Sequence, residues 1–393
     1  MQPSGGFSCS FWNSWSSQLV VTDWPIEMGD GALNRRSRLL SILLSGFLGL
    51  GGAMLATRTA AATGPVEPWL KEAWATYASR FITPEGRVVD NANKDISHSE
   101  GQGYAMLIAV RANDEETFTR IWDWTKSNLF VRNDQLAAWV WDPNTDPHVR
   151  DTDDASDGNL LIAWALTEGG RQWEKNEYVD DARKIATTVG QSSLAQSKFG
   201  QVLLPGSKDY GSGDRPDGPV INLSYWVFPA FPRLASITQG TNWAQLAANG
   251  ISIIRRARFG PERLPSDWIS LARQARPADN FPNVFGYDVI RVPLYLAWGH
   301  PQERKTLAIF EPVLRLARTG PPSAIDIPSG KPKKPFGGQG YDAVIAFLDC
   351  ALNGTSFPKK YLTITADLYY PTTLHLLSLL ALRESYPACL KER

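Results

Sequence analysis

The sequence predicts an all-α protein built from two concentric rings of helices. Two kinds of helical segment alternate along the chain: one is amphipathic and charged, and the other opens on small, polar or aromatic residues and continues as an apolar run. A helix that is apolar on every side is buried on every side. Short connections make consecutive helices antiparallel hairpins, so the inner helices begin at one rim. A plain helical bundle would not open every second helix with polar groups.

The expected elements follow in chain order. Amphipathic segments cover 66–81, 115–129, 178–188, 243–256 and 302–318, and buried segments cover 100–110, 157–166, 222–234, 287–298, 341–352 and 369–382. Prolines at 229, 232, 293 and 371 leave the boundaries of the buried segments open. Strand-like pieces at 87–90, 137–142 and 201–204 predict short β-hairpins, and the turn formers of 207–217 predict a loop.

The composition excludes some classes of function. The chain has 393 residues with 40 basic and 40 acidic side chains, so no global charge attracts nucleic acid or a membrane surface. Its 15 tryptophans and 12 tyrosines suit a core, and flat rings also suit stacking on sugars.

The N-terminal 62 residues read as an extension and export signal, followed by one folded domain over 63–393. Basic residues at 35–38 precede an apolar stretch, 39–55, and the small residues 60–62 offer a cleavage site. The alternative is a permanent membrane anchor, but the glycines of the apolar stretch favour cleavage after Ala62. Met28 is an alternative start, because 34 residues precede the basic cluster. The Arg35-Arg36 pair also permits twin-arginine export.

We expect no metal and no organic cofactor. Three cysteines and four histidines show no metal-ligand spacing, and Asp153, Asp154 and Asp157 lack the glycine and bidentate glutamate of a calcium loop. Cleavage after Ala62 leaves Cys350 and Cys389. An oxidising compartment permits a disulfide between them, but the sequence leaves their pairing open.

Three carboxylates stand at the openings of buried segments. Glu100 lies in SHSEGQGYAM (97–106), Asp157 in ASDGNLLIAWAL (155–166) and Asp288 in GYDVIRVP (286–293). Each has a structural explanation: Ser97 and Glu100 fit a capping box, Asp157 fits an N-cap, and Asp288 can pair with Arg291 one turn later. The glycines flanking Glu100 are poor helix formers that a cap does not require, which favours a catalytic role.

Carboxylates that meet at one rim suit a reaction that needs one protonated and one ionised carboxyl group. Glycoside hydrolysis is such a reaction, because one acid protonates the leaving oxygen while another carboxylate activates water or attacks the sugar. Burial would raise the pKa of the acid, and a neighbouring arginine would keep the base ionised.

Eight motifs in this order resemble glycoside hydrolase family 8, and most closely its periplasmic endoglucanases that accompany bacterial cellulose synthesis. They are GRVVD (86–90), SEGQGYAM (99–106), WDWTKSNL (122–129), AWVW (138–141), ASDGNLLIAWAL (155–166), NLSYWVFP (222–229), SDW (266–268) and GYDVIRVPLYLAW (286–298). The resemblance covers about residues 69–386. It implies an (α/α)6 barrel, or toroid, of six inner and about six outer helices, and cofactor-free cleavage of β-1,4-glucosidic bonds with inversion.

The resemblance also implies site roles. Glu100 is the general acid, Asp288 is the base that activates water, and Asp157 holds and helps to distort the sugar. Arg291 supports the base and is grouped with the substrate-binding residues, which are Tyr104, Trp139, Trp141, Tyr225 and Trp226. Asn159 stands where the family usually has a second aspartate, and we interpret that position as one behind the site that tolerates the change.

The expected partner is a β-1,4-glucan, with a functional link to the cellulose synthase machinery and no nucleic acid. We expect a periplasmic or secreted monomer. A xylanase or chitosanase of the same fold, or a glucan-binding protein without activity, are the alternatives.

Overall fold

Helices dominate the protein, and its strands are short pieces between them. The computed structural model describes residues 66–390, which belong to one compact unit. Its α-helices are α1 Pro68–Phe81, α2 Ser99–Ala112, α3 Glu115–Asn128, α4 Ser156–Gln172, α5 Asn176–Ser192, α6 Phe231–Ala235, α7 Trp243–Arg256, α8 Arg291–Gly299, α9 Arg304–Leu307, α10 Glu311–Ala317, α11 Gln339–Asn353 and α12 Tyr369–Ser385. Single turns of 3-10 helix are η2 Leu223–Tyr225, η3 Ala308–Phe310, η4 Lys359–Tyr361 and η5 Pro387–Leu390.

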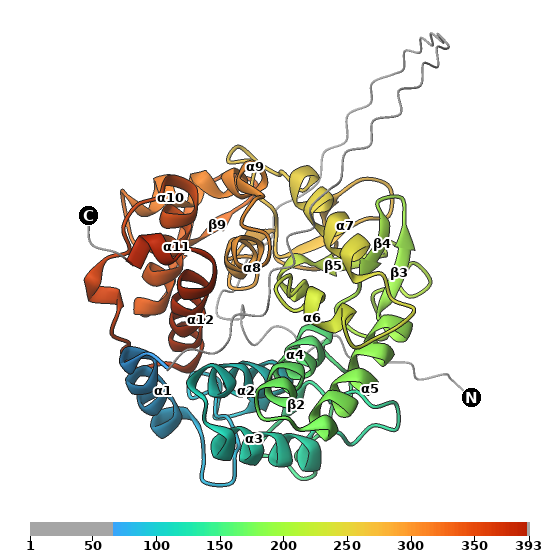
Figure 1. Ribbon diagram of the computed structural model, residues 1–393. Helices are drawn as coiled ribbons and strands as arrows, with labels where there is room; N and C mark the ends of the chain where they lie inside the picture. Colours follow the sequence, from blue (N-terminus) through green and yellow to red (C-terminus); the bar gives the residue numbers. More distant parts are fainter. Residues whose placement is uncertain (1–65, 391–393) are drawn as a thin grey trace, which may run out of the picture. The chain divides into compact units, whose positions relative to one another are not determined.

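The helices form an inner and an outer set. Figure 1 shows α2, α4, α6, α8 and α12 around the centre of this unit, with α1, α3, α5, α7, α9 and α10 outside them. Among the inner helices, α2 packs against α4 and α12, α4 also packs against α6, and α8 packs against α12. Each of α2, α4 and α6 also packs against the outer helix that follows it in the chain. From α1 to α9, outer and inner helices alternate as predicted.

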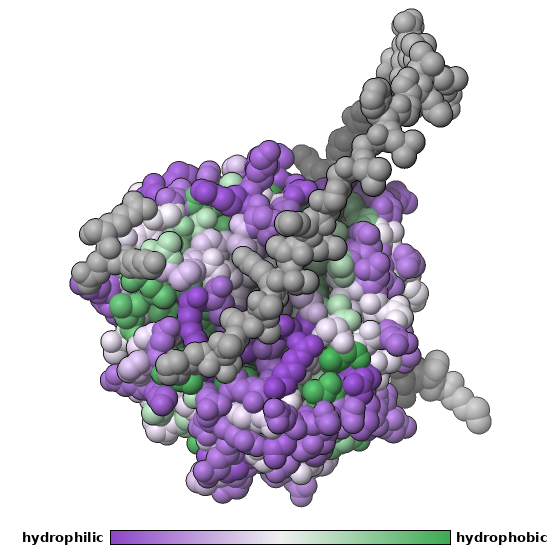
Figure 2. All heavy atoms as spheres, in the orientation of Figure 1, coloured by the Kyte–Doolittle hydropathy of each residue, from purple (hydrophilic) through white to green (hydrophobic). Residues whose placement is uncertain are grey.

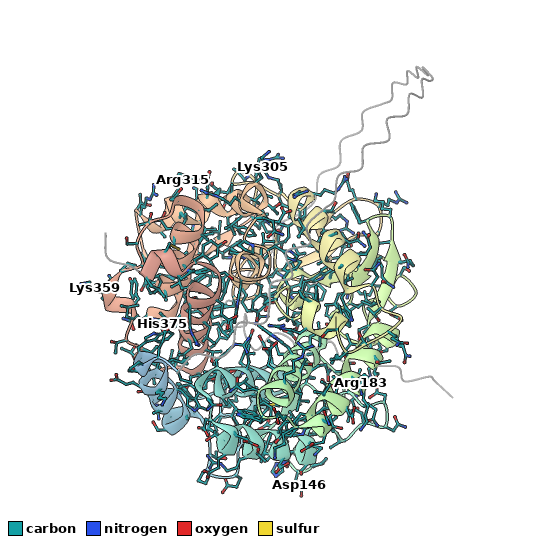
Figure 3. The ribbon with its side chains drawn as sticks, viewed as in Figure 1. Asp146, Arg183, Lys305, Arg315, Lys359 and His375 are labelled. Atoms are coloured by element: carbon teal, nitrogen blue, oxygen red, sulfur yellow. A yellow bond between two sulfur atoms is a disulfide. The ribbon has the colours of Figure 1, made fainter. Side chains whose placement is uncertain are left out.

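The outer helices bury one face each. In α7, which has its predicted bounds, Leu246, Ile253 and Ile254 are buried while Arg255 and Arg256 are exposed. Figure 2 shows a largely hydrophilic periphery on the visible face. In Figure 3 the labelled side chains Arg183, Lys305 and Arg315 lie at the outer margin, as the charged faces of α5, α9 and α10 require.

Four predicted inner segments form helices that are buried around their circumference: α2, α4, α8 and α12. The segment 222–234 is instead split into η2 and α6, because Pro229 and Pro232 cannot continue a helical hydrogen-bond pattern. Pro312 similarly divides 302–318 into α9, η3 and α10. The predicted inner segment 341–352 forms α11, which packs on α8 and α12 but keeps a partly exposed face that includes Asp342 and Asp349.

The strands form small antiparallel sheets. They are β1 Ser97–His98, β2 Val140–Trp141, β3 Leu194–Ser197, β4 Gly200–Leu203, β5 Val220–Asn222, β6 Trp268–Ser270, β7 Arg276–Pro277, β8 Val284–Phe285, β9 Ser323–Asp326 and β10 Pro332–Pro335. The sheet orders are β1-β2, β3-β4, β5-β6-β7 and β10-β9-β8. The predicted strands at 137–142 and 201–204 correspond to β2 and β4, whereas 87–90 makes only isolated bridges. The predicted loop at 207–217 contains no strand or helix.

A partly exposed ion network joins the C-terminal ends of inner helices. Arg111 in α2 lies 3.0 Å from Glu168 in α4 and 2.6 Å from Glu384 in α12. Trp298 in α8 donates its indole N–H to Glu384 at 2.9 Å. The three carboxylates predicted from sequence lie at or near the opposite, N-terminal ends of the inner helices.

Cys350 of α11 and Cys389 of η5 form a disulfide, which settles the pairing that the sequence left open. The predicted export signal and the alternative start at Met28 lie outside the described residues. No helix within 66–390 is long and apolar enough to cross a bilayer.

Candidate active site

Arg291 gathers the polar openings of the inner helices around its guanidinium. It is the first residue of α8 and is 2% exposed. Its Nη1 donates to Glu100 of α2 and to the Tyr370 hydroxyl of α12. Its Nη2 donates to Ser224 at 2.8 Å, and lies 3.4 Å from Asp157 of α4 and 3.7 Å from Asp288. The predicted convergence of three carboxylates at one rim is confirmed.

Glu100 is held by hydrogen bonds to one of its two oxygens. The Tyr104 hydroxyl, one turn further along α2, donates to Oε1 at 2.8 Å, and Arg291 donates to the same atom. No described residue bonds to Oε2, and the side chain is 18% exposed. A proton on Glu100 is therefore expected on Oε2, the oxygen without a protein donor.

The predicted capping box is wrong. Helix α2 begins at Ser99, and its N-cap is His98, whose Nδ1 accepts the amide of Gly101. Ser97 instead lies in β1, and its hydroxyl accepts from Arg87. Glu100 is therefore free of any capping role and directs its carboxylate at Arg291.

Two glycines allow α2 and α4 to cross closely beside the carboxylates. A Cβ added at Gly103 would lie 2.6 Å from the Cβ of Leu161. A Cβ added at Gly158 would lie 2.1 Å from the hydroxyl of Ser99 and 2.8 Å from the amide of Glu100. All three contacts are far inside van der Waals separation, so the absence of a side chain at these glycines allows Asp157 to lie next to Glu100.

Asp157 does not cap its helix. The N-cap of α4 is Ala155, and the carboxylate of Asp157 accepts from the Gly158 amide at 2.8 Å and faces Arg291. Burial is the main reason that the pKa of Asp157 lies well above its usual value, and the charge of Glu100 raises it further. Arg291 opposes both effects. A raised pKa favours a protonated Asp157, which can donate a hydrogen bond.

Asp288 lies in the turn before α8 and has a 30% exposed side chain. Its Oδ2 accepts the amide of Asn222 at 2.9 Å, and its Oδ1 faces Arg291. Burial raises the pKa of Asp288, whereas Arg291 and the Asn222 hydrogen bond lower it. The ion pair with Arg291, which the sequence suggested as a structural role for Asp288, is formed, and it opposes the net rise in this pKa.

Asp267 is a further buried acid to which the sequence assigned no role. One of its oxygens accepts the backbone amides of Gly286 and Val289, at 2.9 and 3.0 Å, and these residues flank Asp288. Burial and the charge of Asp288 raise the pKa of Asp267 well above its usual value. The only sequence signal was the SDW motif, which shows an acid but not its partners.

Asn222, Ser224, Tyr295 and Tyr370 were also not predicted. Asn222 and Ser224 contact Asp288 and Arg291, and Ser224 also bonds to Asn222 at 2.8 Å. The hydroxyl of Tyr295 contacts that of Tyr104, and Tyr370 donates to the carbonyl of Tyr287 at 2.8 Å. Asn222, Ser224 and Tyr295 lie within the motifs NLSYWVFP and GYDVIRVPLYLAW, but the motifs do not show which side chains meet; Tyr370 lies outside every motif.

The tryptophans of AWVW flank the acid through strand pairing. In the β1–β2 pair, Trp141 lies opposite Ser97, and the carbonyl of Trp139 accepts the amide of Ser99. Both indoles are half-buried. The ring of Trp141 has His148 at 4.3 Å and the Arg87 guanidinium at 5.0 Å. Trp139 bonds to the residue before Glu100 and Trp141 pairs with Ser97, so both lie close to Glu100, a position that suits contact with a bound chain.

Three other predicted substrate-binding residues are buried. Trp226 has no exposed surface, and its ring lies where a Cβ on Gly250 of α7 would be, so the prediction that it lines a cleft is wrong. Tyr104 is also fully buried and contacts Glu100 rather than solvent. Tyr225 is 4% exposed, and its ring lies against that of Trp268. Burial raises the pKa of Tyr225 well above its usual value, and the nearby charges of Asp157 and Asp288 raise it further.

Asn159 lies behind the site, as interpreted from sequence. Its Oδ1 accepts the amide of Ala137 at 2.9 Å, and its Nδ2 donates to the carbonyl of Ala155 at 3.1 Å. It therefore ties the segment that leads to Trp139 onto α4. An aspartate could keep the first bond but could not donate the second.

Residues 66–390 contain no group of three or more histidine, cysteine, aspartate or glutamate side chains placed to hold a metal ion. Instead, three carboxylates surround the guanidinium of Arg291. The pKa values of Asp157 and Asp288 are raised, and Glu100 is partly exposed. Such a site is suited to moving protons.

Comparisons with known proteins agree with this chemistry. A model of the family "Glycosyl hydrolases family 8" matches residues 48–384. A probable endoglucanase of Novacetimonas hansenii is 37% identical over 266 residues, which are 66% of this chain and 76% of that protein. The structure of Cel10 from Klebsiella pneumoniae, an endoglucanase described as a family 8 glycosyl hydrolase, superposes with a TM-score of 0.73 and 32% identity, covering 80% of this chain and 99% of that one. The structure of the endo-β-1,4-glucanase CMCax of Acetobacter xylinum superposes with a TM-score of 0.71 and 32% identity, covering 80% of this chain and 98% of that one.

Proposed function

Because this chain belongs to glycosyl hydrolases family 8, we propose that it is an endoglucanase that hydrolyses β-1,4-glucosidic bonds within a glucan chain. Relatives and structural neighbours are named endoglucanases, and one is named an endo-β-1,4-glucanase. The observation that carries the proposal is the bridging of Glu100 and Asp288 by Arg291 at the converging helix ends.

Glu100 acts as the general acid. Its Oε1 is occupied by two donors, so Oε2 presents the proton to the leaving glycosidic oxygen. The two donors also stabilise the carboxylate that remains after the transfer. Tyr104 cannot supply the proton itself, because burial holds its pKa well above the usual value.

Asp288 acts as the base that activates water on the opposite face of the sugar, which inverts the anomeric configuration. Asn222 and Arg291 favour its ionised form. Glu100 and Asp288 contact different nitrogens of Arg291. Asp157, with its raised pKa, holds a hydroxyl of the sugar at the cleavage point as a hydrogen-bond donor.

The finer architecture belongs to the same proposal: the alternating helices are an (α/α)6 toroid, with the site at the rim formed by the inner N-termini. We further propose a periplasmic or secreted monomer whose activity is linked to cellulose synthesis. The resemblance to the Novacetimonas hansenii protein supports the glucan substrate, and the Cys350–Cys389 disulfide fits an oxidising compartment.

The test is the release of reducing ends from carboxymethylcellulose by the wild type and by Glu100→Gln. General acid catalysis predicts a loss of at least about a hundredfold in kcat. Glu116→Gln, an exposed glutamate on α3, is the matched control and should keep full activity. Wild-type activity in Glu100→Gln would refute the assignment of the acid.

Two further measurements test the reaction and the substrate. NMR of the first product should show the α-anomer, and an initial β-anomer would show retention instead. Rates on cellulose, lichenan, xylan and chitosan should favour the glucans. Faster hydrolysis of xylan or chitosan would replace the substrate while leaving the reaction type intact.

A further inference from the structure

A buried acid–imidazole pair lies beside Glu100 and has no part in the mechanism described above. His98 is 7% exposed and Asp90 is 1% exposed. His98 is the N-cap of α2, and its Nδ1 accepts the Gly101 amide at 3.0 Å. Its Nε2 lies 3.7 Å from Oδ2 of Asp90, and neither of these two atoms has a hydrogen-bond partner in the described part of the chain.

The Gly101 amide determines where the imidazole carries its hydrogen. A backbone N–H only donates, so Nδ1 must be unprotonated and the hydrogen must lie on Nε2, facing Asp90. A carboxylate has no hydrogen to donate, so Asp90 disfavours the tautomer with an unprotonated Nε2. The other oxygen of Asp90 accepts the amide of Ala92 at 3.1 Å, which fixes the carboxylate.

The imidazole is also fixed from α12. The ring of Tyr369 lies 5.5 Å from the ring of His98, edge to face at 76°. A Cβ added at Gly101 would lie 2.9 Å from the Tyr369 hydroxyl and 3.3 Å from Nδ1 of His98. The glycine after Glu100 therefore gives His98 and Tyr369 access to the start of α2.

We infer that His98 is a positioning residue for the proton donor, and that Asp90 selects the tautomer in which His98 can act. This inference rests on the proposed function of Glu100. The amide that His98 holds belongs to the residue directly after Glu100, so loss of that bond frees the first turn of α2. The Glu100 carboxylate would then lose its alignment with Tyr104 and Arg291. Misplacement of a group that acts in the transition state lowers kcat more than substrate binding.

The test compares three substitutions by kcat and KM on carboxymethylcellulose. His98→Ala should lower kcat by roughly tenfold to a hundredfold with KM little changed. His98→Asn should restore most of the activity, because asparagine is a good N-cap acceptor. Asp90→Asn keeps the bond to Ala92 but places an amide donor opposite Nε2. It therefore favours the wrong tautomer and should resemble His98→Ala.

A double variant isolates the tautomer effect. In the His98→Asn background no imidazole remains, so Asp90→Asn should add little further loss. Nitrogen NMR of the wild type should show His98 protonated at Nε2, and Asp90→Asn should move the hydrogen to Nδ1. Melting temperatures of all variants show which are folded.

Several results would overturn the inference. One is an unchanged kcat in folded His98→Ala, and another is a loss of kcat in His98→Asn as large as that in His98→Ala. A third is a loss of kcat caused by Asp90→Asn that is the same whether or not His98 is present. The fourth is a wild-type His98 that carries its hydrogen on Nδ1. A wild type that releases no reducing ends from any glucan would refute the proposed function instead, so the two failures are distinguishable.

Discussion

Arg291→Met tests whether one guanidinium holds the carboxylates together. Methionine has a similar length but no charge, so the substitution leaves Glu100, Asp157 and Asp288 without their shared cation. At the 3.7 Å separation from Asp288, the acid that the proposed mechanism keeps ionised, Coulomb's law with an effective dielectric constant of about 20 gives an attraction of roughly 4.5 kcal/mol. Desolvation of the buried guanidinium opposes this, so we expect the free energy of unfolding to fall by about 3–5 kcal/mol at pH 8.

The loss should depend on pH in a defined direction. Arg291 lowers the pKa of both Asp157 and Asp288, so without it their pKa values rise further above the usual range. An acid whose pKa is raised in the folded state makes the protein less stable as the pH increases through that range. The loss caused by Arg291→Met should therefore be smaller at about pH 5 than at pH 8.

The assay is equilibrium unfolding in urea at both pH values, followed by tryptophan fluorescence. An equal loss at the two pH values, or a gain in stability at pH 8, would refute the electrostatic reasoning. Arg111→Met is the control, because Arg111 bridges two carboxylates, Glu168 and Glu384, at the C-terminal ends of α4 and α12. It should lower stability without changing the pH profile of the remaining activity.

Three further predictions concern separate parts of the molecule. Asn222→Ala removes a hydrogen bond that lowers the pKa of Asp288, so the acidic limb of the kcat/KM profile should move to higher pH; an unmoved limb would contradict this role. Trp226→Ala removes a large core side chain and should lower the free energy of unfolding, measured in urea, by about 3–5 kcal/mol. Trp141→Ala changes a half-buried side chain and should mainly raise KM for the glucan. A raised KM in Trp226→Ala together with a loss of stability in Trp141→Ala would contradict both assignments. Reduction of the Cys350–Cys389 disulfide, which spans 39 residues, should destabilise the protein by roughly 4 kcal/mol, and equal urea midpoints with and without reductant would disprove it.

Much of the helical pattern could be predicted because it depends on nearby residues. The bounds of α7 agree with the predicted segment, and those of α3 and α12 agree within a few residues. Their apolar and polar residues recur at helical spacing, which is a local property of the sequence. The segments that failed, 222–234 and 302–318, contain prolines whose effect on a boundary depends on the surrounding packing.

The capping box failed for a non-local reason. Ser97 and Glu100 have the correct spacing, but Ser97 and His98 pair with Val140 and Trp141 as a short sheet. This pairing keeps both residues extended, so α2 begins at Ser99 and His98 becomes the cap. The partner strand is more than forty residues away along the chain, and no local pattern contains that information.

The alternation of helices, the family and the three carboxylates at helix openings could all be inferred from the order of the residues. The tertiary structure decided which groups meet: Arg291 with all three acids, Asp267 behind Asp288, and Trp226 in the core rather than in a cleft. The physical reason is the range of the interactions. Helix formation depends on residues three or four positions apart, whereas the protonation state and exposure of a site residue depend on neighbours contributed by different helices.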